Sequence, residues 1–96
     1  MSPVIEVVLF RSKPGVSLSH MQQAVQRSQE RVATLPGFVS RSTGHAGDGA
    51  YLDVVHWQDM SSAEEAAKVV MTCAECADLM ALIDLEGVQM QHFVKI

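Results

Sequence analysis

The stretch Val4-Ile5-Glu6-Val7-Val8-Leu9-Phe10 decides the fold of this 96-residue chain. It consists almost entirely of β-branched, aliphatic and aromatic residues, which is typical of a central strand covered on both faces. Lys13-Pro14-Gly15 ends the strand, because proline fixes its backbone and glycine permits a turn. Ser17 or Ser19 can then cap a helix, so the chain begins with a strand followed by a helix.

The residues after this cap predict an amphipathic helix that ends before Pro36-Gly37. Apolar residues recur in it at helical spacing, namely Leu18, Met21, Val25, Val32 and Leu35. The segments 38–45 and 51–57 then predict the two strands of a hairpin, because the glycines between them and the pair Asp48-Gly49 favour a tight connection.

The second half of the chain repeats the order of strand and helix. Ser61 and Ser62, each followed three residues later by a glutamate, predict the cap of a second helix. A further helical stretch is expected over about 74–82, after an interruption near Cys73, and a last strand near Val88. The order β-α-β-β-α-β predicts a single ferredoxin-like α+β domain over residues 1–96, with a four-stranded antiparallel sheet in the order 4-1-3-2.

Both helices of such a domain cover the same face of the sheet and leave the other face bare. The first strand is apolar on both sides, and Phe93 lies on the opposite side of the last strand from Met90 and Val94. The bare face would therefore be a larger apolar patch than monomers normally expose. We expect a homodimer in which two sheets pair into a dimeric α/β barrel.

Composition and charge limit the partners of the chain. Hydrophobic residues make up 48% and charged residues 19%, which is typical of a protein with a packed core. Seven Lys plus Arg against eleven Asp plus Glu give a net charge of −4, which argues against nucleic acid or an anionic membrane as a partner. No basic leader precedes the first apolar run, and that run ends at Arg11, so we expect a cytoplasmic protein.

Three stretches carry a resemblance to a known family. They are Val7-Val8-Leu9-Phe10 leading into Lys13-Pro14-Gly15, then Leu35-Pro36-Gly37-Phe38-Val39, and then Val54-Val55-His56-Trp57 ahead of Ser61-Ser62-Ala63-Glu64-Glu65-Ala66. Over about positions 4–71 the chain resembles the antibiotic biosynthesis monooxygenase-like domains of the dimeric α/β barrel superfamily. The resemblance implies a cleft between sheet and helices. Members of this family include cofactor-free oxygenases of aromatic or quinol-like substrates, haem-degrading proteins and small binding proteins.

The haem-degrading branch of this family is disfavoured by three positions. That branch uses an asparagine, a tryptophan and a histidine where this sequence has Glu6, Ala66 and Cys76. None of the three matches, so we expect no haem chemistry and no cofactor.

Glu6, His56 and His92 are the candidate catalytic residues. Glu6 interrupts the apolar face of the first strand, where a buried carboxylate is costly unless it is paired or protonated. It is either a general base or polar anchor, or a residue that reaches solvent or a charge of the partner subunit. His56 and His92 lie on the strands that flank the first strand and can converge on Glu6; the alternative is that each is a hydrogen-bonded histidine of the core.

Trp57, Met71, Met80 and Tyr51 are candidates to line an adaptable apolar pocket, and the alternative is that they only pack the core. A metal site needs three or four converging ligands, and the pair Cys73 and Cys76 alone does not supply them. We expect no metal, and we expect the two cysteines to be buried, unreactive free thiols because they would follow at least two helical turns. Phosphate loops, nucleophile elbows and dinucleotide fingerprints do not occur in the sequence.

These observations predict a protein that binds a small apolar or aromatic molecule. The resemblance implies a cofactor-independent monooxygenase in which Glu6, His56 or His92 abstracts a proton from a phenol-like substrate. The alternative is a non-catalytic, dimeric stress-responsive or interaction protein.

Overall fold

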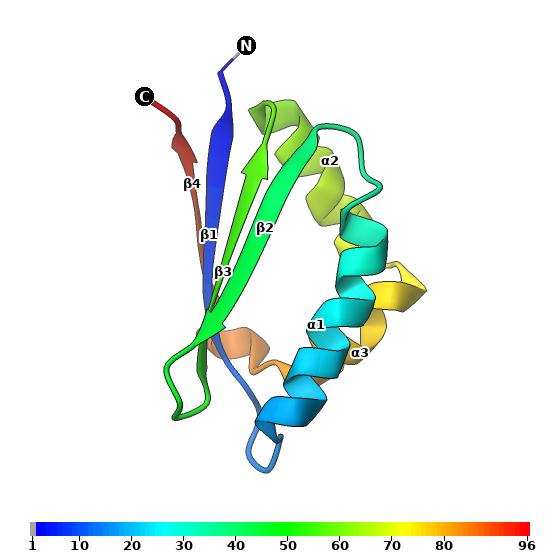
Figure 1. The fold of residues 1–96 in the computed structure, drawn as a ribbon, viewed down its shortest axis with the longest axis vertical. Helices are drawn as coiled ribbons and strands as arrows, with labels where there is room; N and C mark the ends of the chain where they lie inside the picture. Colours follow the sequence, from blue (N-terminus) through cyan, green and yellow to red (C-terminus); the bar gives the residue numbers. More distant parts are fainter. Residues whose placement is uncertain (1) are drawn as a thin grey trace.

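A four-stranded antiparallel sheet forms one layer of the molecule, and three helices cover one of its faces (Figure 1). The structure is a computed structural model that describes residues 2–96. Strand β1 (Val4–Arg11) lies between β3 (Ala50–Trp57) and β4 (Gln89–Val94), and β2 (Phe38–His45) forms the edge beside β3. The order β2-β3-β1-β4 is the predicted order 4-1-3-2 counted from the other edge, so the predicted fold class is confirmed.

Helix α1 (Leu18–Val32) begins at the first of the two predicted caps. The hydroxyl of Ser17 accepts a hydrogen bond from the backbone N–H of His20 at 3.1 Å. Such a bond satisfies one of the backbone donors that a helix start leaves without a partner. The helix packs against α3 (Ala74–Leu82), whose bounds agree with the sequence-based expectation.

Helix α2 (Met60–Val70) begins earlier than predicted. Its cap is Asp59, whose carboxylate accepts a hydrogen bond from the backbone N–H of Ser62 at 2.8 Å. The prediction that Ser61 or Ser62 caps this helix is therefore wrong, because both serines lie in its first turn. Aspartate caps a helix as well as serine does, and it comes first along the chain.

The register of the sheet assigns each residue to a face. In β1, Glu6 is paired with Val55 of β3 and with His92 of β4. Paired residues of antiparallel strands point to the same side, so these three face the helices together with the buried Val4 and Phe10. The neighbouring residue Ile5 is paired with His56 and Phe93, and this row faces away from the helices. We refer to that helix-free side as the open face.

The core consists of two buried clusters between sheet and helices. One surrounds Trp57 and Val55 and includes Ala63 and Ala66 of α2. The other surrounds Phe10 and includes Leu79 of α3. The sheet and α2 enclose most of the first cluster, to which α1 adds Val32 and α3 adds Cys76, while the sheet, α1 and α3 enclose the second. Within residues 2–96, no helix is long and apolar enough to span a membrane.

Gly37 allows the chain to turn from α1 into β2. Its φ is +82°, a conformation that residues with a side chain rarely adopt, and a Cβ atom there would collide with the side chain of Ser62. The carbonyl of Gly37 accepts a hydrogen bond from the backbone N–H of Gln58 at 2.8 Å. Glycine at this position therefore lets the α1–β2 turn pack against the start of α2.

Candidate functional site

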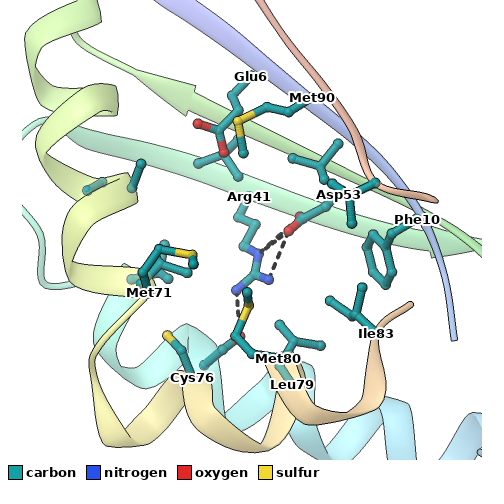
Figure 2. A pocket seen from close by; sticks show the side chains of 18 of the residues that line it. Glu6, Phe10, Arg41, Asp53, Met71, Cys76, Leu79, Met80, Ile83 and Met90 are labelled. Carbon is teal, nitrogen blue, oxygen red and sulfur yellow. Dashed lines mark hydrogen bonds and ion pairs between the residues drawn. The ribbon is translucent and has the colours of Figure 1, made fainter. Parts of the chain in front are cut away.

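A cavity of about 420 Å³ lies between the sheet and the helices (Figure 2). The helix-facing residues of β1 and β3 line one wall, and residues of α2, α3 and the segments that follow these helices line the other. Most of the lining is aliphatic, with methionine, alanine and one cysteine. The lining residues on the helical side include Ala66, Ala67, Val70, Met71, Cys76, Leu79, Met80, Ile83 and Leu85.

Glu6 and His92 meet at the wall of this cavity. Glu6 lines it, and its Oε1 lies 2.9 Å from Nε2 of His92, within hydrogen-bond distance. The side chains are 12% and 23% exposed, so the pair is largely but not completely shielded from water. The central strand β1 and the edge strand β4 position the pair, because the two residues are direct cross-strand partners. The predicted convergence of His92 on Glu6 therefore occurs.

His56 does not take part in this arrangement. It is the cross-strand partner of Ile5 and lies on the open face, whereas its neighbours Val55 and Trp57 face the helices and line the cavity. Side chains of a strand alternate between the two faces, so His56 and Glu6 are on opposite sides of the sheet. Of the three candidate catalytic residues, the structure brings Glu6 and His92 together and separates His56 from them.

Three of the four residues predicted to line a pocket do so. Trp57, Met71 and Met80 line the cavity. Met71, the residue that follows α2, is 67% exposed and therefore lies at the rim. Tyr51 does not line the cavity: its ring stacks on Phe10 with the centroids 5.3 Å apart, so packing is its role here. The three positions compared with the haem-degrading branch, Glu6, Ala66 and Cys76, all line the cavity.

The sequence analysis missed an ion pair between Arg41 of β2 and Asp53 of β3. The guanidinium donates from Nε and Nη2 to both carboxylate oxygens of Asp53, at 2.9 to 3.2 Å. Both residues line the cavity, and their side chains are only 6% and 13% exposed. Figure 2 shows Arg41 reaching from the sheet toward Cys76 and Met80 of α3. The cavity is thus apolar around a buried, paired guanidinium.

Neighbouring side chains hold this ion pair in place. Nη1 of Arg41 donates to the hydroxyl of Ser28 at 2.9 Å and to the side-chain oxygen of Gln29 at 3.3 Å, and both acceptors belong to α1. Thr43 donates to Asp53 at 3.1 Å. Charge-assisted bonds of this kind are the strong hydrogen bonds of proteins, so they join α1 to β2 and β3.

Two hydrogen-bond donors of residues that line the cavity have no partner in the protein. A guanidinium has five N–H groups, and the contacts above engage four of those of Arg41, leaving one on Nη2. The indole Nε1 of Trp57 also has no partner among the described residues, and it is buried from solvent and from the cavity alike. A buried donor without an acceptor is costly. A bound molecule with an oxygen acceptor offers a partner for the remaining N–H of Arg41, which lines the cavity.

The two cysteines lie where α3 begins. Cys73 is the residue before the first turn of α3, and Cys76 lies in that turn and lines the cavity. Burial raises the pKa of the Cys76 thiol to about 12, and a hydrogen bond with Cys73 contributes. The predicted interruption near Cys73 occurs, because α2 ends at Val70 and α3 begins at Ala74. The two cysteines follow the turns of α2, as expected, and they also lie at the start of a new helix. Among residues 2–96, no group of three or more His, Cys, Asp or Glu side chains is arranged to hold a metal ion.

Comparison with known proteins finds likeness in structure and none in sequence. No protein-family model matches the chain, and no curated protein matches it. Among solved structures, SnoaB from Streptomyces nogalater, a cofactor-independent oxygenase, superposes with a TM-score of 0.81 at 18% identity, over 100% of this chain and 95% of SnoaB. A candidate antibiotic biosynthesis monooxygenase from Bordetella bronchiseptica gives a TM-score of 0.78 at 14% identity, covering 100% and 99% of the two chains.

A third solved structure is a dimeric ferredoxin-like protein of unknown function from Thermobifida fusca. It superposes with a TM-score of 0.73 at 14% identity, over 98% of this chain and 92% of that protein. At such identities the likeness is one of fold. The chain therefore has the ferredoxin-like fold that SnoaB and the antibiotic biosynthesis monooxygenase-like proteins share.

Proposed function

We propose that this protein is a cofactor-independent monooxygenase that oxidises a phenol-like aromatic molecule bound in the cavity. The observation that carries the proposal is the Glu6–His92 pair, with 2.9 Å between Oε1 and Nε2, because Glu6 lines a cavity whose walls are mostly apolar. A proton acceptor at such a wall lies within reach of a hydroxyl group on a bound aromatic ring.

The cavity suits a small aromatic molecule. Its volume of about 420 Å³ lies within the range of small-molecule pockets, and few polar groups interrupt its aliphatic lining. Met71, Met80 and Met90 contribute thioether side chains that adapt to irregular shapes. Burial of an aromatic ring against these residues supplies affinity, while the few polar groups set its orientation.

The proposed reaction needs only the substrate and oxygen. The Glu6–His92 pair takes the phenol proton, and the resulting phenolate gives one electron to O₂, so that a phenoxyl radical and superoxide form side by side. Their recombination makes a C–O bond, and loss of water from the hydroperoxide leaves a quinone. With 1-naphthol, one O₂ is consumed and 1,4-naphthoquinone and one water are formed, so no external reductant is required.

Arg41 supplies the second half of the proposed site. It lines the cavity and has one N–H on Nη2 without a protein partner. An oxygen that gains negative charge during the reaction is stabilised by a donor that is already in place. This donor therefore favours a substrate that carries a keto or phenolate oxygen.

The likeness to SnoaB supports the same reaction class. That protein is a cofactor-independent oxygenase, and its fold matches this chain along nearly the whole of both chains. At 18% identity this supports the proposal without assigning a substrate.

We further propose that two copies pair through the open face. Leu9, Leu52 and Phe93 on this face are 46%, 40% and 45% exposed, and they belong to three adjacent strands. Pairing of two such faces removes the apolar patch from water. The Thermobifida fusca neighbour, a dimeric ferredoxin-like protein, supports this arrangement.

Ligand capture separates the proposed function from that of a non-catalytic interaction protein. Freshly purified protein is analysed by native mass spectrometry and then titrated with 1-naphthol and with naphthalene, with the emission of Trp57 as the signal. We expect saturable binding of one molecule per chain and tighter binding of 1-naphthol, because only it bears an oxygen. Absence of saturable binding of both compounds would favour the interaction protein.

A further inference from the structure

We propose that Cys73 and Cys76 form a reversible dithiol–disulfide site at the start of α3, which hydrogen peroxide oxidises beside the cavity. This inference is independent of the proposed function, because it concerns only the two thiols and an oxidant. Its basis is the position of the pair in the fold, which differs from the unreactive position expected from the sequence.

The backbone places the two side chains next to each other. Cys73 immediately precedes the first turn of α3, and the backbone N–H of Cys76 donates to the carbonyl of Cys73 at 3.3 Å. In this geometry the side chain of the capping position lies over the third residue of the helix. Cys73 packs against the buried cluster that contains Cys76. The Cα atoms of two residues three apart around one helical turn lie about 5 Å from each other, which is within the Cα separation that a disulfide needs.

The two thiols differ in a way that assigns their roles. Cys73 is only partly buried at the start of α3, so its sulfur is the more accessible of the two. Cys76 is 1% exposed, and burial raises its pKa to about 12, so it stays a thiol. Cys73 is therefore the group that meets the oxidant, and Cys76 is the group that closes the disulfide.

The chemistry balances with hydrogen peroxide as the oxidant. The Cys73 thiolate attacks one peroxide oxygen, the O–O bond breaks, and hydroxide leaves as a sulfenic acid forms. The sulfur of Cys76 then attacks the sulfur of Cys73, its proton is transferred to the leaving hydroxyl, and water departs. Two thiols and one peroxide thus become one disulfide and two waters.

Oxidation at this position reaches the cavity wall. Cys76 lines the cavity and belongs to the same buried cluster as Trp57, and Cys73 packs against that cluster. Trp57 is the one tryptophan of the chain, so its fluorescence reports directly on changes at this wall. A thiol reductant such as dithiothreitol then restores the two free thiols and the original fluorescence.

The test treats the reduced full-length protein with a small excess of hydrogen peroxide and follows intact mass, disulfide-linked peptides and Trp57 emission. Cys73→Ser and Cys76→Ala are the matched variants. Serine is a preferred capping residue, so Cys73→Ser keeps the start of α3, and alanine is well tolerated in a helical turn. Circular dichroism before treatment verifies that both variants are folded.

We expect the wild type to lose the mass of two hydrogen atoms, to yield a peptide linking Cys73 to Cys76, and to change its Trp57 emission until dithiothreitol reverses all three. Cys76→Ala is expected to stop at a sulfenic acid on Cys73, and Cys73→Ser to react at least tenfold more slowly. Disulfides formed only between chains, or a Cys73 that passes to sulfinic acid while Cys76 stays reduced, would overturn the proposal. Equal peroxide reactivity of wild type and Cys73→Ser would overturn it as well.

Discussion

Arg41 and Asp53 form a forked ion pair inside the cavity, with Nη2 of the guanidinium 2.9 Å from Oδ2 of the carboxylate. The pair lies diagonally across β2 and β3, because Arg41 is registered with Val55 and Asp53 with Thr43. Two opposite charges in such a place are tolerated only together, since either one alone would be a buried, unpaired charge. The pair therefore links the stability of the fold to the polarity of the cavity.

The first prediction concerns the loss of one partner of this pair. Asp53→Leu leaves the Arg41 guanidinium buried without its counter-charge, and the free energy of unfolding should fall by about 3–5 kcal/mol. The double variant Arg41→Met with Asp53→Leu should recover most of this loss, because apolar residues of similar volume replace the pair. Urea unfolding of the wild type, both single variants and the double variant measures the coupling. If the effects of the two single changes on the free energy of unfolding are additive, the ion pair contributes little to stability.

The second prediction concerns the cap of α2 at low pH. Hydrogen bonds from Ser62, the backbone bond first, lower the pKa of Asp59 from its ordinary value of 3.8. The ionised cap thus stabilises the protein above that value, and the stabilisation disappears as the pH falls through the lowered pKa. Asp59→Ala should lower the melting temperature at neutral pH, with a gap to wild type that narrows in acid. Asp59→Asn should keep most of the stability with a weaker acid dependence. A gap that is constant from neutral pH into acid would argue against the ionised cap.

The third prediction concerns the open face. Leu52→Glu places a carboxylate in the centre of the proposed dimer contact, where burial of a charge is unfavourable. Sedimentation velocity should therefore show a dimer for the wild type and a monomer for Leu52→Glu. The matched control is Leu18→Glu, because Leu18 is 38% exposed at the start of α1 on the helical side. Sedimentation of the wild type as a monomer at micromolar concentration would contradict the proposed dimer.

The fourth prediction concerns the thiol of Cys76. Because its pKa is raised to about 12, mainly by burial, its reactive thiolate is scarce at pH 8. Its protonated state stabilises the fold below the pKa of an unfolded thiol, and this stabilisation is lost as the pH rises toward 12. In reduced protein, iodoacetamide should modify Cys73 first and Cys76 only after denaturation, as peptide mass spectrometry will show. Equal labelling of both residues in the folded protein would disagree with this assignment.

The central strands could be predicted from the sequence because their composition is unambiguous. The run Val4–Phe10 and the hairpin segments contain few residues that favour a helix, and glycine and proline mark their ends. The element order, and with it the sheet order, followed from these strands and the segments between them. The start of α2 was less certain, because Asp59, Ser61 and Ser62 are all good caps and only tertiary packing decides among them.

The polar part of the site was harder to predict, because β3 is apolar on both faces. Leu52 and Val54 suggested that His56 shares a covered face, whereas Tyr51, Val55 and Trp57 face the helices. A shift of one residue exchanges the two faces of a strand, and alternation alone does not decide between two apolar sets. The aromatic residues Tyr51 and Trp57 carried the missing signal for the covered face, and Asp53 alternates with them and so shares their side.

The sequence contains no comparable signal that the Arg41 side chain faces the helices. Arg41 lies in β2 among small polar residues, where no apolar alternation marks the inner face. The position of Arg41 is set by the register of β2 with β3 and by its hydrogen bonds to Ser28 and Gln29 of α1. The register and these hydrogen bonds form only in the complete fold.

The most direct test of the central claim measures oxygen transfer with and without the proton acceptor. Wild type, Glu6→Gln, His92→Gln and His56→Gln are incubated with 1-naphthol under ¹⁸O₂, and the quinone is analysed by mass spectrometry. We predict one ¹⁸O atom per quinone for the wild type, with turnover about 100-fold lower in Glu6→Gln and in His92→Gln. His56→Gln should retain the wild-type rate per folded dimer, because His56 lies on the other face of the sheet. Saturable binding of 1-naphthol by the wild type with no ¹⁸O transfer above the protein-free rate, or equal rates in wild type and Glu6→Gln, would contradict the account.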